Sequence, residues 1–201
     1  DIATSSDGTK LVAVAGNGIT PSGIYTSTDS GVTWTERVSA GSRGWRTVAS
    51  SSDGTKLVAA EGGSGYIYTS TDSGANWTER TGAGARNWFD IASSSDGTKL
   101  IAIDGGGGGY IYTSTDSGAN WTQQTGPGVR DWHGVTSSSD GVNLAVVVWD
   151  GRIYTSTDSG VNWTERAGAL GNKSWQSITS SGDGTKLVAS VSSGSVYYST
   201  N

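Results

Sequence analysis

The octapeptide Ser114-Thr-Asp-Ser-Gly-Ala-Asn-Trp121 decides the fold, because the pattern Ser-x-Asp-x-Gly-x-x-Trp also occupies residues 27–34, 70–77 and 156–163. In each copy the Asp carboxylate is placed to accept hydrogen bonds from turn amides, the Gly to take a strained backbone position, and the Trp to pack beneath the turn. We therefore expect four equivalent structural turns. Their Asp and Trp residues are Asp29, Trp34, Asp72, Trp77, Asp116, Trp121, Asp158 and Trp163.

The octapeptide belongs to a longer repeated unit. A Ser/Gly-Asp-Gly turn precedes it in every unit, and both this turn and the Tyr before the octapeptide recur at intervals of 42 to 46 residues. A fixed period of this length is typical of propellers and solenoids. We divide the chain, treated as one domain over 1–201, into repeats at approximately 1–44, 45–87, 88–131, 132–174 and 175–201.

Each unit predicts four short strands. In the third unit, the runs 88–93, 99–103, 110–114 and 121–124 are separated by turn residues, and the Asp-Gly pair at 96–97 is a strong hairpin signal. The second run is apolar on both faces, whereas the fourth is polar or charged, as suits an edge strand. This layout predicts an all-β, five-bladed β-propeller of four-stranded antiparallel blades.

The fifth unit stops inside its octapeptide, at Asn201. Its blade is therefore expected to lack the outer strand, and the segment at Asp1 aligns with a first strand and does not supply it. The sequence leaves two alternatives open. Either five blades form the propeller, or the chain is a fragment of a propeller with six to eight blades.

The four octapeptides resemble the Asp box, or BNR repeat, of the sialidase-like propeller superfamily. That superfamily includes secreted glycosidases, lectin-type propellers and propellers of the photosystem II assembly factor type. The resemblance covers essentially the whole chain and implies the fold. It implies little about activity, because Asp boxes occur on propellers with unrelated functions.

Composition excludes several classes of function. The net charge is -5 and no two basic residues are adjacent, which argues against a nucleic-acid partner. No apolar stretch is long enough to span a membrane. Cysteine is absent, and we predict neither a metal site nor a cofactor. The Ser, Thr and Gly content favours a secreted, extracellular or periplasmic protein, and the absence of an initial Met indicates processing, trimming or incomplete coverage. The oligomeric state stays open.

Strand connectivity gives the array two unlike faces. The Ser/Gly-Asp-Gly turns and the octapeptides lie together on what we call the turn face. The blade-to-blade links and the loops between second and third strands lie on the opposite link face. Each link pairs a cation with an indole, in a combination that either binds a sugar or packs between blades as a structural cation-π pair. These candidates are Arg43, Trp45, Arg86, Trp88, Arg130, Trp132, Lys173 and Trp175.

Side chains on the link face diverge at one position in particular. The residue after the link Trp is Arg46, Phe89, His133 or Gln176 in successive units. The fourth unit is the most distinctive, because Trp149 is the one Trp outside the repeat frame and is our best candidate for an exposed contact residue. Its neighbours add further candidates, which are Asp131, His133, Asp150 and Arg152.

These features favour a non-catalytic binding propeller that binds a carbohydrate or glycoconjugate through the link face. The alternative is a protein-binding scaffold that holds an acidic peptide with its link cations. A glycosidase using Glu61, Asp104 or Asp150 is disfavoured, because the sialidase set of converging Arg, Tyr and Glu is poorly supplied. The near-identity of the units also fits a designed or recently duplicated array with no ligand.

Overall fold

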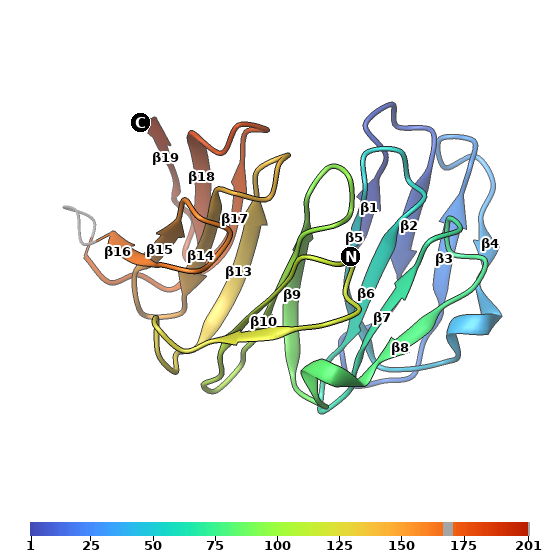
Figure 1. Ribbon diagram of the computed structural model, residues 1–201, viewed down its shortest axis with the longest axis horizontal. Coiled ribbons are helices and arrows are strands. Elements are labelled where there is room, and N and C mark those ends of the chain that lie inside the picture. The colour runs from blue at the N-terminus through green and yellow to red at the C-terminus, as the bar shows by residue number, and fades with distance from the viewer. Residues whose placement is uncertain (167–170, 201) are drawn as a thin grey trace.

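The computed structural model describes residues 1–166 and 171–200. Its strands form five antiparallel sheets, one for each repeat (Figure 1). The first sheet holds β1 (Ile2–Thr4), β2 (Leu11–Val14), β3 (Ile24–Ser27) and β4 (Thr35–Glu36). The second holds β5 (Trp45–Ser50), β6 (Leu57–Glu61), β7 (Ile67–Ser70) and β8 (Thr78–Arg80).

The remaining sheets repeat this order. The third holds β9 (Trp88–Ser93), β10 (Leu100–Asp104), β11 (Ile111–Ser114) and β12 (Thr122–Gln124). The fourth holds β13 (Trp132–Ser137), β14 (Leu144–Val148), β15 (Ile153–Ser156) and β16 (Thr164–Arg166). The fifth holds β17 (Trp175–Ser180), β18 (Lys186–Val191) and β19 (Val196–Thr200). Within the described residues this last blade has three strands, so the predicted fold class is confirmed, including the missing outer strand.

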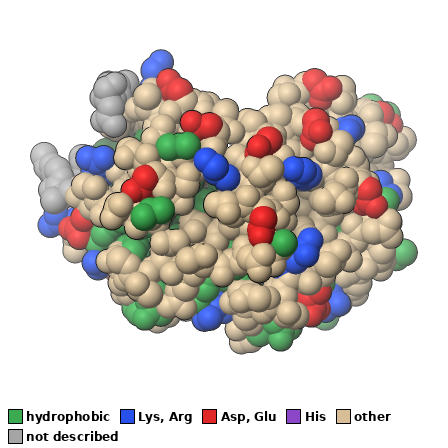
Figure 2. Space-filling view, viewed as in Figure 1, with side chains coloured by type: hydrophobic (Ala, Val, Ile, Leu, Met, Phe, Trp, Pro, Cys, Tyr) green, Lys and Arg blue, Asp and Glu red, His purple; other side chains and the backbone are tan. Residues whose placement is uncertain are grey.

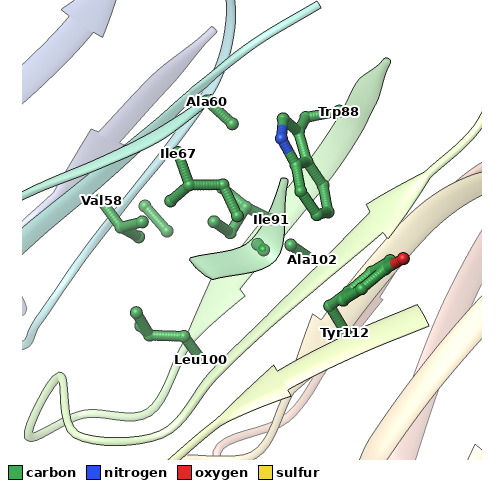
Figure 3. Packing of buried hydrophobic residues seen from close by; sticks show 10 residues of the cluster. Val58, Ala60, Ile67, Trp88, Ile91, Leu100, Ala102 and Tyr112 are labelled. Carbon is green, nitrogen blue, oxygen red and sulfur yellow. The ribbon is translucent and has the colours of Figure 1, made fainter. Parts of the chain in front are cut away.

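The core lies between the blades. The second strands of blades two, three and four are buried on both sides. Figure 3 shows Val58, Ala60 and Ile67 of blade two facing Trp88 and Tyr112 of blade three. The same contact recurs between blades one and two, three and four, and four and five. This explains how a chain with only 33% hydrophobic residues stays folded, because its apolar surface is divided among four thin interfaces.

The turn face is held by repeated polar contacts. Asp72 accepts hydrogen bonds from the amide of Asn76 (2.9 Å) and the hydroxyl of Ser70 (2.8 Å), and Gly74 adopts a φ of 85°. The indole of Trp77 donates to the carbonyl of Gly74 at 3.0 Å. These contacts recur in the other three octapeptides, so the predicted structural role of the repeated Asp and Trp residues agrees with the geometry.

The array is open between its two end blades. Successive inner strands pack side by side from β1 through β5, β9 and β13 to β17, whereas among the described residues β17 and β1 do not pack on each other in this way. In Figure 1 the first blade, in blue, and the fifth, in red, lie at opposite ends of the long axis. Each end blade therefore has one face without a neighbouring blade.

Candidate functional site at the link face

The link face is organised by hydrogen bonds between each second-to-third loop and the links beside it. Arg86 forms a β-bridge with Gly65, and Arg130 forms the equivalent bridge with Gly109. The amide of Trp149 donates to the carbonyl of Asp131 at 2.9 Å. Loops and links therefore meet at one end of the blades, as strand connectivity predicts.

The link tryptophans are core residues. Trp45, Trp88 and Trp132 are 0% exposed and Trp175 is 1% exposed. Each ring packs edge-on against the Tyr of its own blade, with centroids 5.1 Å apart in the pair of Trp88 and Tyr112. The hypothesis that these four rings stack on a sugar is corrected here, because no ligand reaches a buried ring.

The link cations are also engaged within the chain. The guanidinium of Arg86 lies 4.6 Å from the ring centroid of Tyr112 and 3.6 Å from a carboxylate oxygen of Asp104. Arg43 makes the equivalent contacts with Tyr68 and Glu61. Arg130 and Lys173 stack on Tyr154 and Tyr197. The structural interpretation of the links therefore fits, except that the cation stacks on Tyr while Trp packs against the same ring.

A β-bulge follows the link Trp in blades two to five. In blade three, Asp104 pairs with Trp88 and Ile103 pairs with Asp90, so Phe89 is an extra residue. The same irregularity makes Arg46, His133 and Gln176 the extra residues in the other three blades. A bulge redirects the side chain of its extra residue. The residue after each link Trp is therefore oriented differently from the buried Trp itself.

These redirected side chains form a continuous stack across three blades. The Arg46 guanidinium lies 3.5 Å from the Phe89 ring centroid, Phe89 lies 4.4 Å from His133, and His133 lies 4.8 Å from Trp149. All four side chains are partly buried. We call this group the link-face stack. Sequence divergence pointed to its members separately, but only the bulges and the curvature of the array bring them together.

An open hollow of about 330 Å³ lies beside the stack. It is lined by Asp1, Gly16, Asn17, Arg46, Thr47, Phe89 and Asp90. The Thr47 hydroxyl lies 3.0 Å from an Asp1 carboxylate oxygen and 3.2 Å from one of Asp90, so it joins the first and third blades. Burial raises the pKa of Asp90 to about 6, although the amides of Val135 and Ile91 donate to it.

The candidate residues of the fourth blade divide into two groups. Asp131, His133 and Trp149 lie together, with His133 Nε2 3.7 Å from Asp131, and burial lowers the pKa of His133. Asp150 instead accepts a hydrogen bond from Ser174, and Arg152 lies 3.3 Å from Glu165 of β16. Trp149 is partly buried against His133, so our best contact candidate is less exposed than the sequence predicts.

The carboxylates suggested for a hydrolase each have their own partner. Glu61 pairs with Arg43, Asp104 with Arg86, and Asp150 with Ser174. Burial raises the pKa of Asp104, while Arg86 acts in the opposite direction. Each carboxylate therefore has a local structural contact in its own sector of the link face.

The described residues contain no group of three or more His, Cys, Asp or Glu side chains arranged to hold a metal ion. In the same part of the chain, no helix has the length and apolarity needed to cross a membrane. Figure 2 shows that Lys and Arg are interspersed with Asp and Glu on the face in view.

Comparisons with solved structures agree with this architecture. A structure titled YCF48 bound to D1 peptide matches with a TM-score of 0.68 and 17% identity, over 98% of this chain and 62% of that chain. The chain is a β-propeller. A nidogen/laminin complex matches this propeller with a TM-score of 0.73 and 16% identity, over 98% of this chain and 73% of that chain.

A further match is YCF48 from Cyanidioschyzon merolae, with a TM-score of 0.67 and 18% identity, over 100% of this propeller and 66% of that chain. The propeller thus spans 62% of the length of the peptide-bound YCF48 structure. No family model and no curated protein matches its sequence. At these identities the likeness concerns the fold.

Proposed function

We propose that this chain is a non-catalytic binding propeller that holds a segment of another protein on its link face. The observation that carries the proposal is the link-face stack. Its four members differ from one another although the frame around them is repeated, and two of them, Arg46 and Phe89, line an open hollow. Partly buried aromatic and Arg side chains beside a cavity are typical of residues that dominate binding energy.

The hollow indicates what kind of segment fits. Its volume lies near the lower end of the range for ligand pockets, which suits one inserted side chain. Asp1 and Asp90 place two carboxylates on its wall, together with one cation, Arg46, whose guanidinium lies over the ring of Phe89. Because the side-chain carboxylates outnumber the guanidinium, a peptide side chain that donates hydrogen bonds and carries a positive charge, such as Lys or Arg, complements this wall.

The acidic-peptide and carbohydrate alternatives have less support. The link cations that would hold an acidic peptide already stack on Tyr rings, and two of them pair with carboxylates. The four link indoles that would stack on a sugar are buried. Two of the similar structures carry titles that name a peptide or protein complex, which supports a protein ligand as the proposal.

Absence of catalysis is part of the proposal. Glu61, Asp104 and Asp150 near the link face have Arg or Ser partners. His133 lies between Phe89 and Trp149, and among the described residues its one acidic partner is Asp131. A general acid or base needs a placed reacting partner. The surroundings of His133 therefore suit a contact with a bound peptide better than proton transfer.

The test is a displayed peptide library screened against the purified chain. We expect enriched peptides to contain Lys or Arg next to apolar residues, and their affinity to fall at least tenfold in Trp149→Ala and Arg46→Ala. Gln176→Ala is the matched control, because Gln176 occupies the same bulge in blade five but is exposed and outside the stack.

Two results would overturn the proposal. One is an equal loss of affinity in all three variants, which would place the contact elsewhere. The other is enrichment of no peptide together with saturable binding on a glycan array, which would restore the carbohydrate hypothesis.

A further inference from the structure

The two end blades expose the two halves of one packing surface. We call the side of a blade that packs on its successor the forward face, and the opposite side the backward face. In the second strands, Val12, Val58 and Ile101 of the forward faces are only 1–2% exposed. The equivalent Val188 of blade five is 42% exposed, and Val196 on the same face is 68% exposed. Blade five thus presents an uncovered forward face.

Blade one presents the complementary backward face. Ile2 is 57% exposed, whereas Val48 and Ile91 at the equivalent position are each 4% exposed. Leu11 and Ala13 beside it are partly exposed, although their equivalents in blades two to four are buried. The residue types that cover a forward face within the array are therefore present on blade one.

Polar contacts of the turn face are also left incomplete at the two ends. Lys56 Nζ donates to the carbonyl of Asp96 in the next blade at 2.9 Å, and Lys10 does the same to Asp53. Among the described residues, Lys186 of blade five makes no such bond and the carbonyl of Asp7 in blade one receives none. Blade five therefore has an unused donor, and blade one has the acceptor that would match it.

A backbone ladder repeats this complementarity. The amide of Ser6 donates to the carbonyl of Ser52, and the series continues through Ser95 and Ser139 to Gly182, with distances of 2.7 to 2.8 Å. Within the described residues, the amide of Gly182 and the carbonyl of Ser6 are the unpaired ends of the series. Apolar, side-chain and backbone contacts therefore all continue in the same register.

We propose that the forward face of blade five binds the backward face of blade one in a second copy of this chain, head to tail. A second copy fits because the contact continues the interface that the chain already forms four times. Such an interface is heterologous, so each added copy presents the same two faces again. Assembly then extends with concentration unless the rotation between copies closes a ring.

One residue makes this contact weaker than those within the chain. Thr26 packs closely on Gly74 of the next blade, since a Cβ added to Gly74 would lie 3.0 Å from the methyl carbon of Thr26. Blade five has Tyr198 at the equivalent position, and this side chain is 83% exposed. The larger ring must turn aside before Gly31 of a second copy approaches, so Tyr198→Thr should strengthen the association.

Sedimentation velocity over a wide range of protein concentration tests the proposal. We expect the average mass of the sedimenting species to rise with protein concentration. The variants Val188→Asp and Ile2→Asp should each stay monomeric. Val161→Asp is the matched control, because Val161 is 71% exposed and lies in the octapeptide of blade four, which is neither of the two end blades. Circular dichroism checks that each variant folds.

Mixing the two disrupted variants gives the decisive measurement. Val188→Asp keeps an intact blade one and Ile2→Asp keeps an intact blade five, so their mixture should form capped heterodimers while each alone stays monomeric. A wild-type chain that is monomeric at every concentration overturns the proposal. Association that survives Val188→Asp, or a mixture without heterodimers, also overturns it.

Discussion

The pKa values of carboxyl groups are shifted in opposite directions on the turn face and near the link face. On the turn face, hydrogen bonds from its own turn lower the pKa of Asp72 to about 2, with the amide of Asn76 contributing most. Near the link face, burial raises the pKa of Asp90 to about 6. The first environment is local and is copied in every blade. The second is formed by groups from three blades, the Thr47 hydroxyl and the backbone amides of Ile91 and Val135, and occurs where the repeat has diverged.

The difference teaches where variation is tolerated in this propeller. Each octapeptide turn satisfies its own polar groups, and the turns of blades two to four also contact the preceding blade, so a change there affects two structural units. The bulged residues of the link face contribute no regular ladder pairs, so unlike side chains can occupy the same position. The predictions below test this division.

The largest effect is expected from the core beneath the link face. Trp88→Ala should destabilise the fold by about 3–5 kcal/mol, because a fully buried Trp leaves a large cavity. Trp121→Ala on the turn face should cost less, since Trp121 is only partly buried. Urea denaturation measures both. Equal losses would contradict the expectation that the greater burial of Trp88 makes its removal more costly.

Two glycine-to-alanine substitutions compare a crowded position on the turn face with a position where a new Cβ meets no neighbouring atom. Gly118→Ala should cost about 1–3 kcal/mol, because φ is 82° and the new Cβ would lie 2.8 Å from the methyl carbon of Thr69. Gly126→Ala is the control, since nothing lies within 4 Å of its Cβ position. Thermal unfolding should separate the two variants by several degrees. Similar melting temperatures would show that the octapeptide turn is not strained.

The dependence of stability on pH should show both kinds of carboxylate. Asp29 and Asp72 have folded-state pKa values of about 2, below the ordinary 3.8, so their contribution is present above about pH 4 and is lost as the pH falls toward 2. Asp90 has a raised pKa, so its contribution is present below about pH 4 and is lost as the pH rises through 6.

Denaturation between pH 2 and 7 should therefore give a maximum of stability near pH 4. Burial raises the pKa of both Asp90 and Asp104, so both contribute to the decline above it, each with a slope of at most about 1.4 kcal/mol per pH unit. Asp90→Asn should reduce that decline and leave the acid limb unchanged. If the decline is the same in the variant, Asp90 does not contribute to it.

The smallest effect is expected at the link cations. Arg86→Gln should cost about 0.5–1 kcal/mol, since its guanidinium is partly exposed while it stacks on Tyr112. Arg130→Gln should cost less still, because Arg130 is more exposed and stacks on Tyr154 without an ion-pair partner among the described residues. Chemical denaturation of both variants checks the order. A reversed order would mean that the Asp104 contact does not contribute.

Much of the fold could be predicted because each blade is specified by short-range signals. Strand β9 begins at Trp88 and ends at Ser93 as expected, whereas β10 is shifted by one residue to Leu100–Asp104. That shift accompanies the bulge, which no turn residue or hydrophobic period announces. The local sequence left open whether the link indoles bind a sugar or pack between blades, and their burial in the structure decides for packing.

By itself the sequence determined the period, the blade, the octapeptide turn and the division into two faces, because these depend on residues within a few positions of one another. Only the tertiary structure decided which link-face side chains meet. Arg46, Phe89 and His133 are separated by more than forty residues from one to the next, and the distance between them depends on the twist and packing of whole blades. The same packing decided that the two end faces remain uncovered, since the burial of Val188 or Ile2 requires a neighbouring blade.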